Sequence, residues 1–443
     1  MRYRMNFYRK YLCFSLVVLM FASCNSWLDV EPKSQVKDKD LYSSESGFKE
    51  ALAGVYSIMT QEYLYGKELT FGMLGVLAQE WDYEPSEYAD DKLYKYESTK
   101  PEIRIDSIWC GLYNAIANAN KLLEEIDAKQ SKFTGVNYEV IKGEALALRA
   151  YLHFDLLRVF GASYAEKPDK MAIPYVTAYT SDVFPQKTVA EVIGKVLEDL
   201  TTASEYLKND PMYTGKVVTE TDDNGYLLNR QVHLNYYAVK GLMARVYLYK
   251  KDYTNAARCA SEVVESGKFE WVEQANLTNE NMADVSFSSE HLFALNVVTL
   301  GNRVEKYFSG SSSFFAMDEA TLLDYYGSAQ DYRYLYQFKT GTGLNSTLRY
   351  PRKYDQLEGD GTTAWSVRYR NKMPLIRLSE MYYILAECRH YTSGDALGAL
   401  NEVRRHRGVA DLGESDVADF GATLLSEFRK EVVAGVARGG TKG

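Results

Sequence analysis

Two stretches of the sequence combine aromatic rings with hydrogen-bonding side chains. The first holds Trp81, Asp82, Tyr83 and Tyr88. The second holds Arg303, Tyr307, Phe308 and Phe314. Rings beside polar groups are typical of a site for sugars: a ring stacks on the C–H face of the sugar, and polar groups meet its hydroxyls. One such contact adds about 0.5–1.5 kcal/mol, by analogy with aromatic pairs, so useful affinity needs several. The alternative is that these rings pack the loops onto the protein body.

A catalytic centre is not indicated by any motif. The chain has 60 Asp and Glu residues, so a glycosidase-like carboxylate pair stays open. It contains no Gly-x-Ser-x-Gly, no His-Glu-x-x-His and no phosphate-binding glycine loop followed by Lys and Ser or Thr. The histidines show no metal-ligand spacing: His153, His233, His291, His390 and His406. We therefore predict a non-enzyme with no cofactor and no metal site.

The first 24 residues have the layout of a bacterial lipoprotein signal. Four basic residues open it: Arg2, Arg4, Arg9 and Lys10. The apolar run from Tyr11 to Ala22 is too short to span a bilayer as a helix. Two small residues, Ala22 and Ser23, then precede Cys24, as in a lipoprotein cleavage site. We predict a signal peptide at 1–23 and an acylated Cys24, whose lipid chains supply the membrane affinity. Plain secretion is the alternative.

Removal of this signal leaves an acidic protein. The whole chain has 51 Lys and Arg against 60 Asp and Glu, a formal net charge of −9. Residues 1–23 contain four of the basic residues and none of the acids, so 47 against 60 remain, a net charge of −13. Phosphates repel an acidic body. We therefore expect neither nucleic acid nor an anionic lipid surface as a partner.

Helical periodicity dominates the chain from residue 46 onward. Apolar residues recur every three or four positions over 108–126 and again over 138–160, where Gly161 marks a stop. A third helix is expected over 188–207, with Thr188 as its N-cap and Glu191 completing a capping box. The polar stretch 24–45 is expected to be a tether.

Residues 237–268 match the spacing of a tetratricopeptide repeat. With Tyr237 as position one, Ala244, Ala256 and Ala260 occupy positions eight, twenty and twenty-four, where small residues let paired helices approach. A weaker match runs over 379–404. Between about 270 and 370 the helical periodicity fades, and glycine, serine and aromatic residues dominate. These patterns predict a mostly α fold, a tetratricopeptide-like helical-repeat scaffold with a long, loop-rich insertion and a few short strands.

Four segments of the chain resemble signature segments of the SusD/RagB lipoprotein family. They are residues 24–32, 114–123, 143–161 and 374–404, and they occur in the order that the family shows. The resemblance implies about four tetratricopeptide-like helix pairs, with insertions that form the ligand face. It places ligand-binding aromatics in loops of the regions that hold Trp81 and Tyr307.

The resemblance also implies a role and a location. SusD-like proteins are lipid-anchored on the outer membrane and exposed at the cell surface, where they deliver nutrient to a SusC-like TonB-dependent transporter. A glycan ligand is expected here, with an oligopeptide ligand or a protein-interaction scaffold as alternatives and a helical glycoside hydrolase as a remote one.

One SusD-like domain is expected over 46–431, with its N-terminal part at 46–230 and its C-terminal part at 270–431. After Glu431 the sequence departs from the family, because a glycine-rich stretch without a packing pattern, 432–443, replaces the usual aromatic segment. The departure is what a truncation or a shifted reading frame would produce, so we expect this tail to be atypical.

Overall fold

The computed structural model describes residues 40–278, 283–310, 314–356 and 370–435. Cys24, the predicted signal peptide and nearly all of the predicted tether lie outside the described residues, as does the tail from residue 436. Within the described ranges, no helix is both long and apolar enough to cross a membrane.

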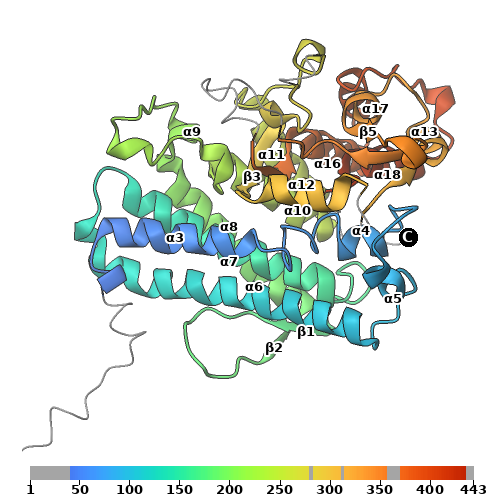
Figure 1. Cartoon of the computed structure of the whole chain (residues 1–443). Helices are drawn as coiled ribbons and strands as arrows, with labels where there is room; N and C mark the ends of the chain where they lie inside the picture. Colours follow the sequence, from blue (N-terminus) through green and yellow to red (C-terminus); the bar gives the residue numbers. More distant parts are fainter. Residues whose placement is uncertain (1–39, 279–282, 311–313, 357–369, 436–443) are drawn as a thin grey trace, which may run out of the picture.

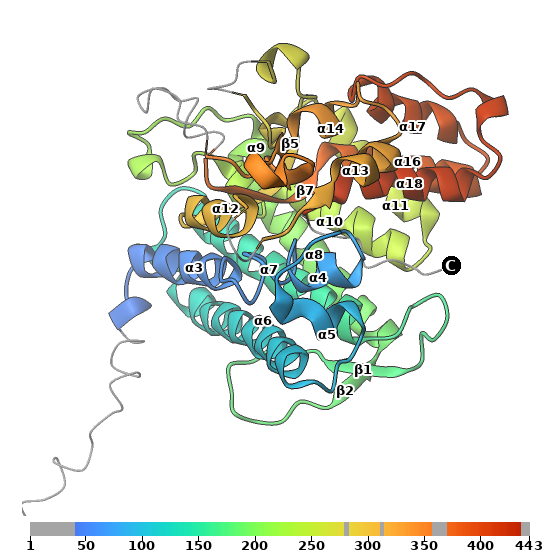
Figure 2. The same cartoon turned by 45° about the vertical axis from the view of Figure 1, so that its right-hand side comes forward.

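The body is a succession of long helices in which each packs against the next. In chain order they are α3 (Glu45–Met59), α6 (Thr99–Ile126), α7 (Asn137–Phe160), α8 (Val189–Tyr206), α10 (Tyr236–Tyr249), α11 (Tyr253–Glu265), α16 (Leu378–Tyr391) and α17 (Ala396–Arg405). Taken two at a time they form four helix pairs. The predicted mostly helical, repeat-like fold is confirmed. Figures 1 and 2 show α3, α6 and α7 below, with the C-terminal helices above them.

The ends of these helices follow from local sequence chemistry. Thr188 caps α8 by accepting a hydrogen bond from the Glu191 amide at 3.2 Å, and the Glu191 carboxylate accepts one from the Thr188 amide at 2.7 Å. Gly161 ends α7. In the pair α10–α11, Ala244, Ala256 and Ala260 are fully buried, so the small-residue spacing of the repeat does allow close helix packing.

Two antiparallel strands close the insertion at its base. Strand β3 (His291–Asn296) pairs with β7 (Lys372–Arg377), with His291 opposite Arg377 and Asn296 opposite Lys372. The chain thus leaves and rejoins the helical body at one place. The remaining strands of the described residues form two small sheets. One contains β1 (Met171–Pro174) and β2 (Gln186–Thr188). In the other, β6 (Leu348–Pro351) lies between β4 (Met317–Asp318) and β5 (Phe338–Thr340).

Short helices fill much of the space that the sequence assigned to loops. They are α4 (Met73–Leu77), α5 (Ala89–Lys92), α9 (Pro211–Thr214), α12 (Leu300–Phe308), α13 (Glu319–Tyr326) and α14 (Tyr332–Tyr336). Three of them, α12 to α14, belong to the insertion, which therefore contains more helix than its weak periodicity predicts.

The last described residues are packed into the body. Helix α18 (Phe420–Val432) is followed by Val433 and Ala434, which are 4% and 1% exposed. Their carbonyls accept hydrogen bonds from Lys353 and Tyr354, and the Ala434 amide donates to Glu80 at 3.2 Å. Residues 433 and 434 are thus packed although the sequence after residue 431 shows no packing pattern, because backbone groups and small side chains make the contacts.

Candidate functional site

The two aromatic stretches of the sequence meet at a seam between the segment after α4 and the segment after α12. The Tyr83 amide donates to the Ala316 carbonyl and the Ala316 amide to the Tyr83 carbonyl, both at 3.0 Å. Beside this bridge, the Asp82 carboxylate accepts a hydrogen bond from the Asp318 amide at 2.8 Å. Regions far apart in the sequence are thus joined by backbone pairing.

Most of the predicted ligand-binding rings lie beneath this seam. Four of them are at most 3% exposed: Trp81, Tyr88, Tyr307 and Phe308. They pack with Phe71 and Phe315, at ring-centroid distances of 4.8 Å for Phe71–Phe308 and 5.3 Å for Trp81–Phe315. These rings hold the loops on the helices, which is the alternative that the sequence left open, and they present no open face to a ligand.

The polar atoms of Trp81, Tyr88 and Tyr307 donate hydrogen bonds to other groups of the protein. The Trp81 indole donates to the Phe71 carbonyl at 2.9 Å. The Tyr88 and Tyr307 hydroxyls donate to the Glu68 and Glu62 carboxylates, each at 2.9 Å. Because each donor has a partner, ligand binding is not needed to explain these side chains.

Arg303 belongs to this buried layer as well. It is 7% exposed, and its Nη1 donates to the Gly66 carbonyl at 3.2 Å. Arg303, Tyr307 and Phe308 lie on helix α12, not on a loop. Leu300, Val304 and Phe308 follow at intervals of four and are all buried, but the helix has only nine residues, too few turns for this spacing to establish a helical period in the sequence.

Three exposed tyrosines lie at the seam and in the segment that follows α5, and sequence reasoning missed two of them. Tyr83 is 43% exposed, Tyr94 43% and Tyr96 45%. The rings of Tyr94 and Tyr96 lie 6.4 Å apart, and the Tyr94 hydroxyl donates to the Leu77 carbonyl at 3.0 Å. The clue to both was their place in a short, non-periodic segment directly after the predicted stretch. We call Asp82, Tyr83, Tyr94 and Tyr96 the tyrosine surface.

One ion pair and one hydrogen bond of Lys92 link the two segments that form the tyrosine surface. Lys92, at the end of α5, donates to the Glu84 carboxylate at 2.6 Å and to the Trp81 carbonyl at 3.3 Å. The segment that carries Tyr83 is therefore tied to the one that carries Tyr94.

A buried ion pair holds α5 against α6. Arg104 donates to the Asp91 carboxylate at 2.9 Å, and its guanidinium lies 4.1 Å from the centre of the Tyr88 ring. Burial raises the pKa of Asp91, and the charge of Arg104 opposes this shift. The support beneath the tyrosine surface is thus a rigid, charged and aromatic layer.

Phe314 is the remaining residue of the predicted ligand set. It is half-buried, with its ring 5.5 Å from that of Tyr350. Of the eight predicted residues, Asp82, Tyr83 and Phe314 keep exposed surface with which a solute can be contacted. Among the described residues, no three or more His, Cys, Asp or Glu side chains are grouped so that they could hold a metal ion.

Two family profiles match this chain and between them cover nearly all of it. The profile described as "Starch-binding associating with outer membrane" matches residues 26–248, and the profile described as "SusD family" matches residues 201–434. The chain belongs to the SusD family. The resemblance stated from the four sequence segments is confirmed.

Curated SusD-like proteins match part of the chain. A SusD-like protein of Bacteroides ovatus is 23% identical over 253 residues, which are 56% of this chain and 40% of that protein. SusD-like protein P38 of Formosa agariphila is 25% identical, over 56% of this chain and 43% of that protein. The matches thus span less than half the length of these relatives.

Solved structures of SusD-type proteins share the fold over most of this chain. A SusD-like carbohydrate binding protein from Bacteroides vulgatus has a TM-score of 0.67 at 21% identity, covering 88% of this chain and 81% of that one. Surface glycan-binding protein A from Bacteroides fluxus has a TM-score of 0.62 at 20% identity, covering 89% and 88%. At these identities the likeness establishes a common fold only. Proteins that share a fold can differ in their binding surfaces and functions.

Proposed function

We propose that this SusD-family protein is a lipid-anchored, cell-surface protein that binds a glycan without cleaving it and delivers it to a SusC-like TonB-dependent transporter of the outer membrane. Family membership supports this role, and so do fold neighbours described as carbohydrate- or glycan-binding. The observation that carries the ligand part is the tyrosine surface, where three half-exposed rings and a carboxylate lie on a rigid support.

The chemistry of the tyrosine surface suits a neutral, hydroxyl-rich ligand. Tyrosine rings offer apolar faces to the C–H groups of a sugar, and their hydroxyls and Asp82 offer hydrogen bonds. Rings on a fixed support lose little conformational freedom on binding. Modest affinity is expected, because each ring contributes only about 0.5–1.5 kcal/mol.

Calorimetric titration with a panel of oligosaccharides and oligopeptides tests the ligand part. We expect saturable binding of at least one oligosaccharide, weakened about three- to tenfold by Tyr83→Ala or Tyr94→Ala, the loss of one ring contact. Tyr179→Ala is the matched control, because Tyr179 is 50% exposed and lies outside the tyrosine surface.

Three other results would replace the proposal. Binding of oligopeptides alone would make the protein a peptide receptor. If the protein bound no ligand of the panel but still bound the transporter, it would be a protein-interaction scaffold. Products released from a polysaccharide by the purified protein would make it an enzyme.

A further inference from the structure

The backbone directly after α18 forms a tight turn that is buried in the body. The Gly435 amide donates to the Val432 carbonyl at 2.8 Å, and the two residues between them are 4% and 1% exposed. Val433 has φ −48° and ψ 132°, and Ala434 has φ 55°, which is the form of a type II turn. The position of Ala434 in such a turn favours glycine, because a side chain is disfavoured at positive φ. We call residues 432–435 the C-terminal strap.

Side chains from two other segments hold the backbone of the C-terminal strap. Lys353 donates to the Val433 carbonyl and Tyr354 to the Ala434 carbonyl, and both donors come from the insertion. The Ala434 amide donates to the carboxylate of Glu80, which lies shortly after α4, at 3.2 Å. The strap therefore joins the insertion to the N-terminal half of the body.

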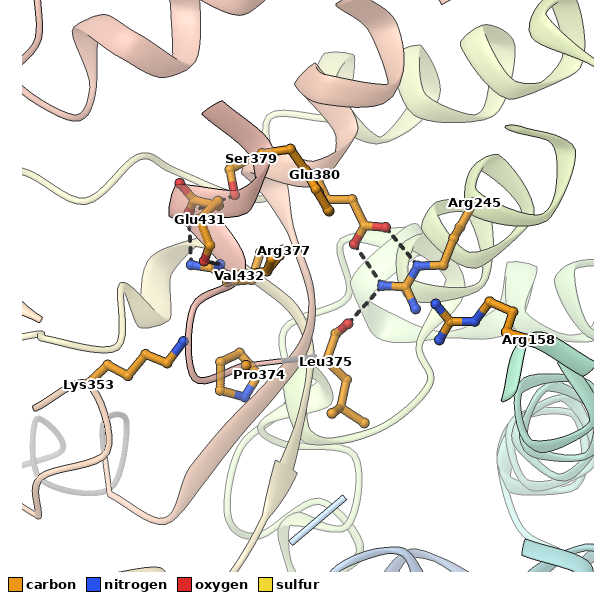
Figure 3. Close-up of a pocket in the computed structure, with 12 residues that line it drawn as sticks. Arg158, Arg245, Lys353, Pro374, Leu375, Arg377, Ser379, Glu380, Glu431 and Val432 are labelled. Atoms are coloured by element: carbon orange, nitrogen blue, oxygen red, sulfur yellow. Dashed lines mark hydrogen bonds and ion pairs between the residues drawn. The ribbon is translucent and has the colours of Figure 1, made fainter. Parts of the chain in front are cut away.

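A charged cavity lies beside the strap, between the N-terminal and C-terminal halves of the helical body. Val432 and Gly435 line it from the strap and Lys353 from the insertion, while Arg158 and Arg245 line it from α7 and α10. Figure 3 shows the Lys353 side chain extended toward the end of α18. Because the strap borders open space on this flank, its hydrogen bonds have to fix it there.

Opposite charges on Glu80 and Lys353 support this arrangement. Burial raises the pKa of the Glu80 carboxyl and lowers the pKa of the Lys353 ammonium group. The charge of each group opposes the shift of the other. The two side chains that hold the strap from different segments therefore attract each other.

Glu80 leads from the strap directly to the tyrosine surface. Its amide donates to the Gly75 carbonyl of α4 at 3.0 Å. Trp81 follows it in the chain, and Tyr83 comes two residues later. A Glu80 carboxylate that is bound to the Ala434 amide therefore limits the freedom of the segment that carries Tyr83.

Tyr354 connects the strap to the aromatic layer beneath the tyrosine surface. Its ring centre lies 6.3 Å from those of Phe71 and Phe308. The Trp81 ring belongs to the same layer, 6.5 Å from that of Phe308. Two routes from the strap, through Glu80 along the chain and through Tyr354 across the layer, thus meet at Trp81.

We propose that the C-terminal strap positions the tyrosine surface: by binding Glu80 and Tyr354, residues 432–435 fix the segment that carries Tyr83 on the aromatic layer. A ring that is held in place before binding loses less conformational freedom when a ligand arrives. The strap positions this ring and does not itself contact the ligand. Its effect on ligand affinity rests on the proposed function, whereas its effect on the stability of the seam does not.

Hydrogen–deuterium exchange of the full-length protein tests the positioning without a ligand. Ala434→Pro removes the amide that donates to Glu80, and proline cannot adopt a positive φ. We expect the paired amides of Tyr83 and Ala316 to exchange about tenfold faster, with α7 and α8 unchanged. Ala434→Gly is the matched control, because glycine keeps the amide and readily adopts a positive φ, so wild-type exchange is expected.

A second pair of variants decides the question where Ala434→Pro does not fold. Glu80→Met removes the acceptor of the strap amide, whereas Glu80→Gln keeps an oxygen acceptor; both remove the charge, so the pair isolates the hydrogen bond. We expect faster exchange at the seam for Glu80→Met only. Unchanged seam exchange in Glu80→Met, or equally faster exchange throughout α7 and α8, would overturn the proposal.

Oligosaccharide titration extends the test to ligand binding. We expect Ala434→Pro to weaken binding about three- to tenfold, no more than Tyr83→Ala does, and the double variant to lose nothing further, because the strap acts through Tyr83. Additive losses would overturn this action. If the wild type binds no oligosaccharide, the proposed glycan role fails, and the exchange rates still decide whether the strap holds the seam.

Discussion

At the scale of single residues, two aromatic side chains close together in the chain differ in exposure. Trp81 is 3% exposed and packs in the aromatic layer, whereas Tyr83, two residues later, is 43% exposed at the seam. The sequence identified both as aromatic residues in a non-periodic stretch. It did not separate them, because burial there depends on a backbone bridge to Ala316, far along the chain. The region of the candidate site was predictable; the ring that faces solvent was not.

Alanine substitutions at Trp81 and Tyr83 are expected to differ in their effect on the free energy of unfolding, because one residue is buried and the other is exposed. Trp81→Ala is expected to lower the free energy of unfolding by about 3–5 kcal/mol, since it opens a cavity in the aromatic layer. Tyr83→Ala is expected to change it by no more than about 0.5 kcal/mol, as for other surface positions. Urea unfolding followed by circular dichroism measures both. A stability loss of similar size for the two variants would contradict the assignment.

A buried histidine gives a prediction on acid stability. His153 is fully buried, its Nδ1 donates to the Arg149 carbonyl at 2.8 Å, and its Nε2 accepts from the Val176 amide at 2.9 Å. The ring is therefore held neutral. Burial lowers the pKa of His153 to about 3, and the nearby charge of Arg149 acts in the same direction.

The lowered pKa fixes the pH window. The unfolded chain takes up this proton below about pH 6.5, the usual histidine pKa, and the folded protein only near pH 3. Stability from this residue is thus present above pH 6.5 and lost as the pH falls toward 3, with an upper limit of about 5 kcal/mol. Urea midpoints between pH 7 and 4 should fall less steeply for His153→Gln than for wild type. His390→Gln, which removes an exposed imidazole, is the control; identical slopes for all three proteins would refute the prediction.

At the scale of elements, the long helices with a clear apolar period were predictable from the sequence, and the short helices were not. The stripes over 108–126 and 138–160 lie within α6 and α7, because long amphipathic runs leave little choice of conformation. Helix α12 has only nine residues, and its sequence alone gave too few turns to establish a period. In the structure, Tyr307 and Phe308 of this helix are buried and pack on Phe71. The packing of Val433 and Ala434 rests on backbone hydrogen bonds, which leave no side-chain pattern.

Helix α18 supplies the carboxylate that organises the C-terminal charges. Glu431 is 2% exposed and pairs with Arg333 at 3.1 Å, Arg377 at 2.9 Å and Arg407 at 2.8 Å. Burial would raise its pKa, but the three arginines together hold the pKa well below its ordinary value. The carboxylate thus joins α18 to α14, to the end of β7 and to the segment after α17.

Loss of this charge is expected to loosen the C-terminal half. Glu431→Gln removes the carboxylate that Arg333, Arg377 and Arg407 share, although Arg333 keeps Asp331 and Glu427 and Arg407 keeps Glu290. We expect the free energy of unfolding to drop by about 3–5 kcal/mol, because a buried ion-pair network loses one of its charges. Glu402→Gln is the matched control: Glu402 pairs with the exposed Arg405, and the change should cost no more than about 1 kcal/mol. Denaturant unfolding of the three proteins provides the comparison. Equal midpoints would show that the network does not depend on this carboxylate.

At the scale of the whole molecule, the tyrosine surface and the charged cavity between the two halves lie on different elements of the acidic helical body. The tyrosine surface lies on the segments around α5, and the cavity lies where α7, α10, β7 and the end of α18 converge. None of the described helices is long and apolar enough to cross a membrane. We propose that the lipid predicted at Cys24, outside the described residues, attaches the protein to the membrane.

Replacement of that cysteine tests the attachment directly. Acyl chains contribute about 0.8 kcal/mol of membrane affinity per buried CH₂, and no comparable contribution is expected from a body with a net charge of −13 (47 Lys and Arg against 60 Asp and Glu after residue 23). We expect Cys24→Ala to move the protein from the membrane pellet to the soluble fraction. Cys110→Ala, which removes an exposed free thiol of α6, should leave it in the pellet. A high-salt wash of the pellet separates lipid attachment from charge-mediated association with a transporter. If Cys24→Ala still sediments after the wash as wild type does, the lipid anchor is wrong, and the proposed surface location loses its physical basis.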